Sequence, residues 1–122
     1  MLRLGRERET LNVVCDQVGT PTYAADLAQA IMVIAQKSKQ DIPEDRIFHY
    51  SNEGVCSWYD FAHEIMQHAG LKCVVKPIET KDYPTPAARP HYSVLNKARI
   101  RTTYSLEIPH WKDSLKNCLS VM

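Results

Sequence analysis

Hydrophobic and polar positions along the chain change period several times, and they predict short strands separated by helices. The β-branched run 11–16 favours a strand, as do the segments 46–50 and 72–78. Pro77 lacks a backbone N–H, so it places the last of these at an edge or an end of a sheet. The polar segment 37–44 is expected to be a loop.

A first long helix is expected after Thr22, which we interpret as its N-cap, with Asp26 near its positive end. Its apolar stripe has helical spacing and consists of Leu27, Ala28, Ile31, Ile34 and Ala35. Met32 and Val33 add apolar side chains outside this stripe. We therefore expect this helix to be sandwiched between layers.

A second helix is expected to begin after Ser57, with Asp60 completing a capping box and Gly70 ending it. Its apolar face is Trp58, Phe61, Ala62, Ile65, Met66 and Ala69. A short helix over 95–101 and a last helix opened by Pro109 follow. The last helix is expected to bury Trp111, Leu115, Cys118 and Leu119. Both tryptophans are thus predicted to be core residues.

The stretch 80–92 contains Pro84, Pro86 and Pro90, which exclude regular helix and central strand. The prolines stiffen it, so its side chains can be presented with little entropy left to lose. Three short strands and about four helices remain. This alternation predicts an α/β (or α+β-like) fragment with one domain over residues 1–122.

Charge and composition exclude several classes of protein. The chain has 122 residues, with 15 Lys and Arg against 14 Asp and Glu, so its net charge of +1 gives no reason to expect nucleic acid or an anionic membrane as partner. Its apolar stretches are shorter than the ~20 residues that span a bilayer. The N-terminal segment lacks the apolar region of a secretory signal. We expect a cytoplasmic protein.

Metal and disulfide chemistry are not expected. The four cysteines, Cys15, Cys56, Cys73 and Cys118, lack the spacing of a zinc site and are interpreted as reduced. His63 and His68 are five residues apart, whereas a helical zinc site needs a spacing of four. We therefore expect both histidines to face solvent.

No self-contained catalytic motif is present. The sequence lacks G-x-S-x-G, a Walker loop and G-x-G-x-x-G, and none of its six tyrosines has a lysine four residues on. Such a lysine would lower the pKa of a catalytic phenol. We expect no catalytic residue, cofactor or metal on this chain.

The remaining candidates suit recognition. The loop 17–22 offers the Gln17 amide, backbone N–H groups near Gly19, and the hydroxyls of Thr20 and Thr22, which fit sugar hydroxyls or a phosphate. The alternative is a plain strand-to-helix turn. Arg89, held in a rigid Ala-Arg-Pro segment, could bind a phosphate or could simply be a surface arginine.

Three motifs in this order carry a family resemblance: DQVGTPT over 16–22, SNEG over 51–54 and YPTPAARP over 83–90. Together they resemble the C-terminal part of the dTDP-4-dehydrorhamnose reductases, which are extended short-chain dehydrogenases. The resemblance implies that a Rossmann domain holding NAD(P)H and the catalytic Thr, Tyr and Lys lies outside this sequence. It also implies substrate-binding roles for Gln17, Gly19, Thr20, Pro21, Thr22 and Arg89, and no catalytic role for any matched position.

The complete enzyme implied by the resemblance reduces dTDP-4-dehydro-L-rhamnose with NAD(P)H in dTDP-rhamnose synthesis. We expect the dTDP-sugar as the partner of this region, no reductase activity from the chain alone, and a homodimer through the face that would contact the Rossmann domain. A non-catalytic sugar-nucleotide-binding or regulatory module, part of a related epimerase or synthase, and a small hydrolase using Asp16 and Asp26 remain alternatives.

Overall fold

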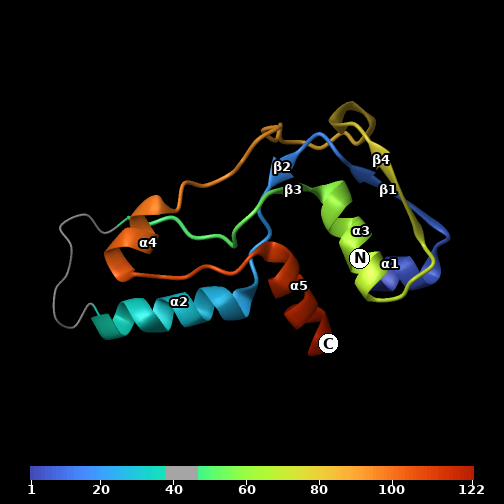
Figure 1. The fold of residues 1–122 in the computed structure, drawn as a ribbon. Helices are drawn as coiled ribbons and strands as arrows, with labels where there is room; N and C mark the ends of the chain where they lie inside the picture. The colour runs from blue at the N-terminus through green and yellow to red at the C-terminus, as the bar shows by residue number, and fades with distance from the viewer. Residues whose placement is uncertain (38–46) are drawn as a thin grey trace.

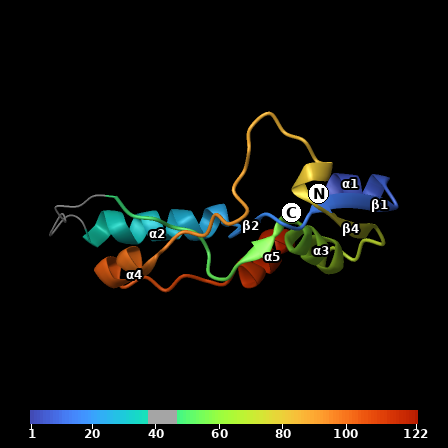
Figure 2. The same cartoon turned by 90° about the horizontal axis from the view of Figure 1, so that it is seen from above.

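The computed structural model describes residues 1–37 and 47–122, which form an elongated molecule (Figures 1 and 2). Along the chain the elements are α1 (Leu2–Glu7), β1 (Thr10–Val14), β2 (Val18–Gly19), α2 (Ala24–Lys37), β3 (Cys56–Ser57), α3 (Trp58–His68), β4 (Val74–Ile78), the 3₁₀ turn η1 (Thr80–Asp82), α4 (Ala98–Tyr104) and α5 (Trp111–Ser120). One end holds β1, β4, α1 and α3, and the other holds α2 and α4. The predicted α/β fragment is confirmed.

The strands form two small sheets. β1 and β4 run parallel with Thr10 opposite Val74 and Val14 opposite Ile78, whereas β2 and β3 are antiparallel. In a two-stranded sheet each strand is an edge, so Pro77 lies at an edge as predicted. Successive side chains of a strand point to opposite faces, and Leu11 and Val75 point to the buried face. α3 packs against both strands.

The core lies between this sheet, α3 and α5. Its buried residues are Leu11, Val13, Cys56, Ala62, Ile65, Met66, Cys73, Val75, Trp111 and Leu115. The predicted capping box is confirmed, because Ser57 Oγ accepts from the Asp60 amide while the Asp60 carboxylate accepts from the Ser57 amide. Satisfying these donors fixes where α3 begins.

The strand predicted over 46–50 is wrong for the residues that the structure describes. Arg46 lies outside the described ranges, as does all of the predicted loop 37–44 except Lys37, which belongs to α2. Residues 47–50 form no strand, and no strand of the described ranges pairs with them. Ile47 is 73% exposed, while Phe48 packs edge-to-face on Tyr104.

The packing of α2 also differs from the prediction. Only Ala30 is buried, whereas Leu27, Ile31 and Met32 are 37, 55 and 57% exposed, because within the described ranges α2 has its main helix contact with α4. The prediction that this helix is sandwiched between layers is therefore wrong. The helix begins at Ala24 rather than directly after Thr22, and the Leu27 amide donates to the Tyr23 carbonyl.

The other helix boundaries shift by a few residues. The helix predicted over 95–101 is α4, and α5 begins at Trp111 with His110 as its N-cap rather than at Pro109. α1 was not predicted; a Cβ at its Gly5 would lie 3.0 Å from a methyl of Leu71 and closer still to Met66, so glycine permits this helix to pack tightly. No helix within the described ranges has the length and apolarity needed to cross a membrane.

Candidate functional site

The two regions predicted to bind a ligand lie side by side. The Val18 amide donates to the His91 carbonyl at 2.7 Å, and the Ser93 amide donates to the Val18 carbonyl at 2.9 Å. Val18 and Tyr92 thus form a parallel bridge. β2 therefore pairs with two segments, the end of the proline-rich segment and the antiparallel strand β3. Figure 1 shows this convergence in the middle of the molecule.

Gly19, Thr20 and Pro21 line a hollow of 130 Å³ beside β2. The other lining residues are Cys56, Ser57, Trp58, Phe61 and Ser93. A Cβ at Gly19 would lie 3.0 Å from Ser93 Oγ, so any larger residue there would narrow the hollow. The Thr20 hydroxyl donates to the Gly54 carbonyl at 2.7 Å and anchors this wall to the SNEG turn.

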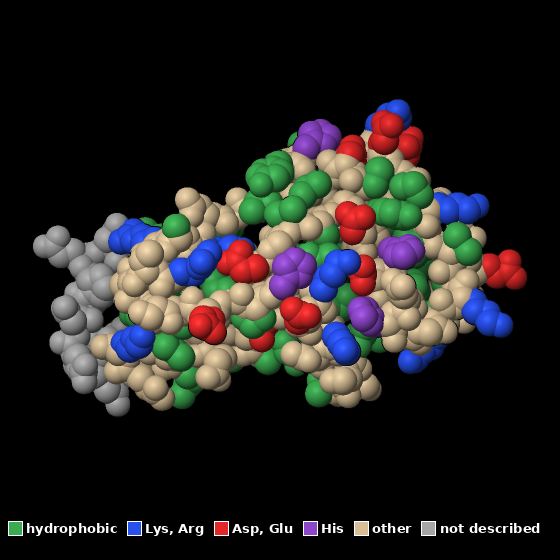
Figure 3. Space-filling view, in the orientation of Figure 1, with side chains coloured by type: hydrophobic (Ala, Val, Ile, Leu, Met, Phe, Trp, Pro, Cys, Tyr) green, Lys and Arg blue, Asp and Glu red, His purple; other side chains and the backbone are tan. Residues whose placement is uncertain are grey.

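Trp58 provides an exposed aromatic wall of the hollow. Trp58 is 49% exposed, so its predicted role in the core is wrong. Trp111 is 3% exposed, so its predicted role in the core is confirmed. Trp58 shares the helical stripe of the core residues, but it is the first residue of α3 and lies next to the hollow. Hydrophobic side chains gather on this part of the surface, over β2, β3 and the proline-rich segment (Figure 3).

The other predicted binding residues lie outside the hollow. Gln17 is buried and its Nε2 donates to Thr80 Oγ1 at 3.1 Å, whereas Thr22 and Arg89 are exposed. Within the described ranges no hydrogen bond or ion pair engages the Arg89 guanidinium. The structure therefore gathers three of the six predicted residues in one hollow and leaves Arg89 on a neighbouring exposed segment.

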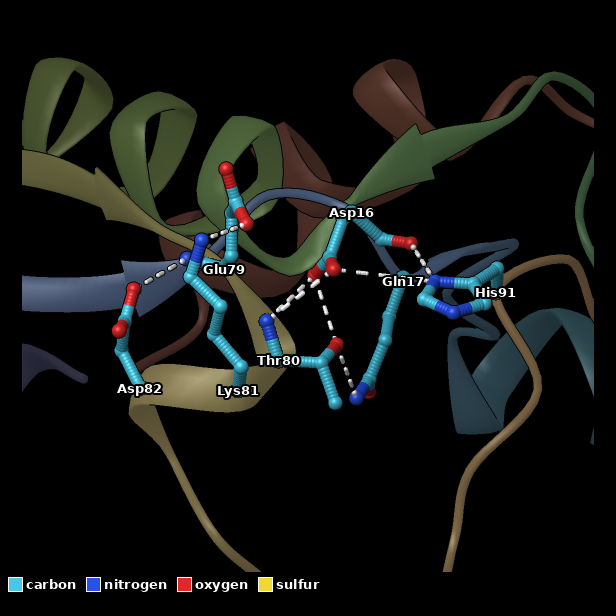
Figure 4. A network of polar contacts seen from close by, with 7 residues as sticks. All are labelled: Asp16, Gln17, Glu79, Thr80, Lys81, Asp82 and His91. Carbon is cyan, nitrogen blue, oxygen red and sulfur yellow. Dashed lines mark hydrogen bonds and ion pairs between the residues drawn. The ribbon is translucent and has the colours of Figure 1, made fainter.

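A polar network that sequence reasoning missed joins these segments (Figure 4). The Asp16 carboxylate accepts from the Thr80 amide at 2.9 Å and from the Thr80 hydroxyl at 2.7 Å. These hydrogen bonds hold the pKa of Asp16 below its usual value. His91 Nδ1 lies 2.9 Å from the Asp16 carbonyl oxygen. The sequence placed Asp16 at the start of the DQVGTPT motif but did not indicate its contacts, because they depend on the pairing of β1 with β4.

The SNEG turn holds the middle of the molecule through Asn52, which is fully buried. Asn52 Nδ2 donates to Asp26 Oδ2 at 2.6 Å and to Ser114 Oγ at 2.8 Å, and Oδ1 accepts from the Tyr23 amide at 2.8 Å. The neighbouring Glu53 pairs with Lys97, which lies 3.3 Å away. The motif thus joins α2 and α5 and supports the loop that precedes α2.

Gly54 completes this turn with φ of +81°, a conformation that side chains other than glycine rarely adopt. A Cβ there would also lie 2.9 Å from Trp111 Cδ1 and still closer to the ring of His110. The turn can therefore pack directly against the start of α5, which is a physical reason for glycine at this position.

The potential metal ligands and the glycines of the chain are scattered. No group of three or more histidine, cysteine or acidic side chains within the described ranges is placed to hold a metal. No two of the chain's four glycines have the Gly-x-Gly spacing of a dinucleotide-binding loop. His63 and His68 are exposed, as predicted, and all four cysteines are free. Lys, Arg, Asp and Glu side chains are interspersed on the face in Figure 3.

Comparison with known proteins places this arrangement among characterised relatives. The family model described as the RmlD substrate binding domain matches residues 1–122. The spore coat polysaccharide biosynthesis protein SpsK of Bacillus subtilis is 37% identical over 119 residues, covering 98% of this chain and 40% of the relative. The dTDP-4-dehydrorhamnose reductase of Aggregatibacter actinomycetemcomitans is 39% identical, covering 96% of this chain and 42% of the relative.

Solved structures agree with these matches. The crystal structure of dTDP-4-dehydrorhamnose reductase from Bacillus anthracis in complex with NADP superposes with a TM-score of 0.87 at 36% identity. The match covers 99% of this chain and 41% of that one. The chain therefore spans about two-fifths of the length of the proteins that it resembles.

Proposed function

We propose, since the chain belongs to the family of RmlD substrate binding domains, that it binds the sugar nucleotide substrate of a dTDP-4-dehydrorhamnose reductase. The observation that supports this most directly is the hydrogen-bonded ladder between Val18 and residues 91–93. It places the hollow and the Arg89 segment next to each other, so that an elongated ligand can contact both. A sugar nucleotide has this form, with uncharged rings at both ends and a charged diphosphate between them.

The two parts of the site suit different parts of such a ligand. No residue that lines the hollow is charged, and Pro21 and Trp58 give it apolar walls. An uncharged ring, either the deoxyhexose or the thymine, therefore fits there better than a phosphate does. The exposed Arg89 guanidinium can donate paired hydrogen bonds to the diphosphate.

The reductase reaction itself is proposed for the longer protein of which this domain would be a part. In that reaction NAD(P)H would supply a hydride to C4 of dTDP-4-dehydro-L-rhamnose, and a tyrosine outside this chain would supply a proton to the C4 oxygen, giving dTDP-L-rhamnose and NAD(P)⁺. The residues of this chain do not fit that cofactor, because the chain has no glycine-rich dinucleotide loop. We propose that Gln17, Gly19, Thr20, Pro21, Thr22 and Arg89 serve to bind and orient the substrate and to exclude water.

Two further properties belong to this proposal. All four cysteines are free, which supports a location in the cytoplasm. The exposed apolar face of α2, formed by Leu27, Ile31 and Met32, supports homodimer formation by the isolated chain.

Calorimetric titration with dTDP-L-rhamnose tests the proposal. We expect dTDP-L-rhamnose to bind to the purified chain, and we expect no binding when free L-rhamnose is titrated in its place. Arg89→Ala should weaken it by roughly ten- to hundredfold, since a hydrogen bond to a charged group contributes ~1.5–3 kcal/mol. With NADPH and dTDP-4-dehydro-L-rhamnose the isolated chain should show no turnover. Absence of binding would contradict the proposed substrate site, and measurable turnover would contradict the proposed division of roles.

A further inference from the structure

We propose that Asp16 closes the proline-rich segment 81–90 into a loop, and that this closure positions Arg89 for the diphosphate of the ligand. The inference deepens the proposed function and rests on it. We use the name Asp16 clasp for the contacts of Asp16 with Thr80 on one side of the segment and with His91 on the other (Figure 4). Asp16 and His91 would be positioning residues, acting on the ligand only through Arg89.

The N-terminal side of the clasp is held by the Asp16 carboxylate. Both of its oxygens accept from the Thr80 amide, at 2.9 and 3.1 Å, and one also accepts from the Thr80 hydroxyl at 2.7 Å. The same hydroxyl accepts from Gln17 Nε2 at 3.1 Å, so Thr80 is held by two consecutive residues. Thr80 is also the first residue of η1, which begins the segment.

The C-terminal side of the clasp is held by the imidazole of His91. Its Nδ1 lies 2.9 Å from the Asp16 carbonyl oxygen, an arrangement in which Nδ1 carries the proton and donates. The same nitrogen lies 3.7 Å from Asp16 Oδ2. The Val18 amide donates to the His91 carbonyl, so backbone and side chain of His91 are fixed together. One residue, Asp16, therefore contacts both ends of the segment.

The segment between these ends depends on the clasp for its position. All residues over 81–90 are exposed, and the segment makes a wide excursion from the body of the molecule (Figure 2). Only Pro90 separates Arg89 from His91. The ring of Pro90 fixes its own φ and restricts Arg89 to extended conformations. Because the backbone between them is stiff, the position of His91 restricts the position of Arg89.

This reasoning predicts an energetic coupling between the clasp and Arg89. When the clasp is intact, Arg89 is presented in one place and its hydrogen bonds to the diphosphate cost little entropy. When the clasp is broken, the same guanidinium must be ordered on binding, so its hydrogen bonds contribute less to the free energy of binding. A contribution of Asp16 to stability alone would leave the contribution of Arg89 unchanged, so the two roles can be separated by a double-mutant cycle.

The experiment measures the Kd of the chain for dTDP-L-rhamnose by calorimetry. The variants are Thr80→Val, which removes the hydroxyl contact with Asp16 but keeps the amide contacts, His91→Ala, which removes the imidazole contact at the other end, Arg89→Ala, and each clasp variant combined with Arg89→Ala. Thr80→Ser keeps the hydroxyl, and Thr85→Val makes the same Thr-to-Val change within the segment, where the hydroxyl donates to the nearby Ala87 carbonyl. Thermal unfolding of each variant shows that it is folded.

We expect Thr80→Val and His91→Ala each to weaken binding by about tenfold, and Thr80→Ser and Thr85→Val to bind like the unaltered chain. In the clasp variants the loss caused by Arg89→Ala should shrink to about threefold or less. Losses that simply multiply would overturn the inference while leaving the proposed function intact. If the unaltered chain does not bind dTDP-L-rhamnose, the proposed function fails and the inference fails with it.

Discussion

Asn52 gives the clearest test of what individual residues contribute to the fold. Replacing it with alanine would remove its hydrogen bonds, leave the Tyr23 amide without its acceptor and take one donor away from the Asp26 carboxylate, which keeps the Ser114 hydroxyl. A buried group left unsatisfied costs ~1–3 kcal/mol, so Asn52→Ala should lower the free energy of unfolding by about 3 kcal/mol in chemical denaturation. Asn12→Ala, at an exposed position of β1, is the control and should change it little. Equal effects of the two changes would contradict this role for Asn52.

Cys56 predicts a pH dependence of stability. Burial raises the pKa of its thiol to about 11, and the nearby Asp60 carboxylate acts in the same direction. The thiol of an unfolded chain titrates near ~8.5, so Cys56 stabilises the fold fully below that pH and loses this contribution as the pH rises toward its folded pKa. Melting temperatures measured over about pH 8 to 11 should therefore fall more steeply for the unaltered chain than for Cys56→Ala. Parallel curves would contradict the shifted pKa.

At this scale the sequence predicted some roles and not others. The capping pair Ser57 and Asp60 was predictable because its contacts are local. Trp58 was wrongly assigned to the core. Helical spacing identifies the apolar stripe of a helix, but it does not show how far along the helix other elements cover that stripe. The contacts of Asp16 with Thr80 and His91 span 64 and 75 positions of the chain, so no local pattern could indicate them.

Among the elements, α3 forms part of the core and of the hollow, so the stability of its first turn affects both. Ser57→Ala removes the cap and should lower the free energy of unfolding by ~1 kcal/mol, as capping residues typically do. Ser120→Ala, at the exposed end of α5, is the control, since it removes a hydroxyl that donates to the nearby Asn117 carbonyl. If urea denaturation shows the same small effect for both, the capping box does not stabilise α3 measurably.

Among the predicted elements, β1, β4 and α3 also pack as their periodicity indicates. β1 and β4 pair with each other, and α3 covers them, so their hydrophobic periods match their surroundings. The segment 47–50 has the composition of a strand but no strand beside it in the described ranges. α2 has apolar positions on more than one side, yet most of them are exposed. Periodicity indicates which positions are suited to burial, and only tertiary contacts decide whether they are buried.

For the molecule as a whole, the exposed face of α2 predicts self-association. Sedimentation velocity should detect a dimer that weakens when Ile31→Lys places a charge on this face. Gln29→Lys adds the same charge at another exposed position of α2 and should leave the association unchanged. A strictly monomeric chain at high concentration would contradict the proposed homodimer.

The proposed binding site is assembled from distant parts of the sequence. The hollow and the Arg89 segment meet where β2 is hydrogen-bonded to residues 91–93. Fold and site thus depend on the same contacts.

The most direct measurement is the calorimetric titration of the chain with dTDP-L-rhamnose, repeated with Arg89→Ala. The account predicts saturable binding that requires the nucleotide part of the ligand and weakens at least about tenfold when Arg89 is replaced. No heat of binding, or the same Kd for both proteins, would contradict it.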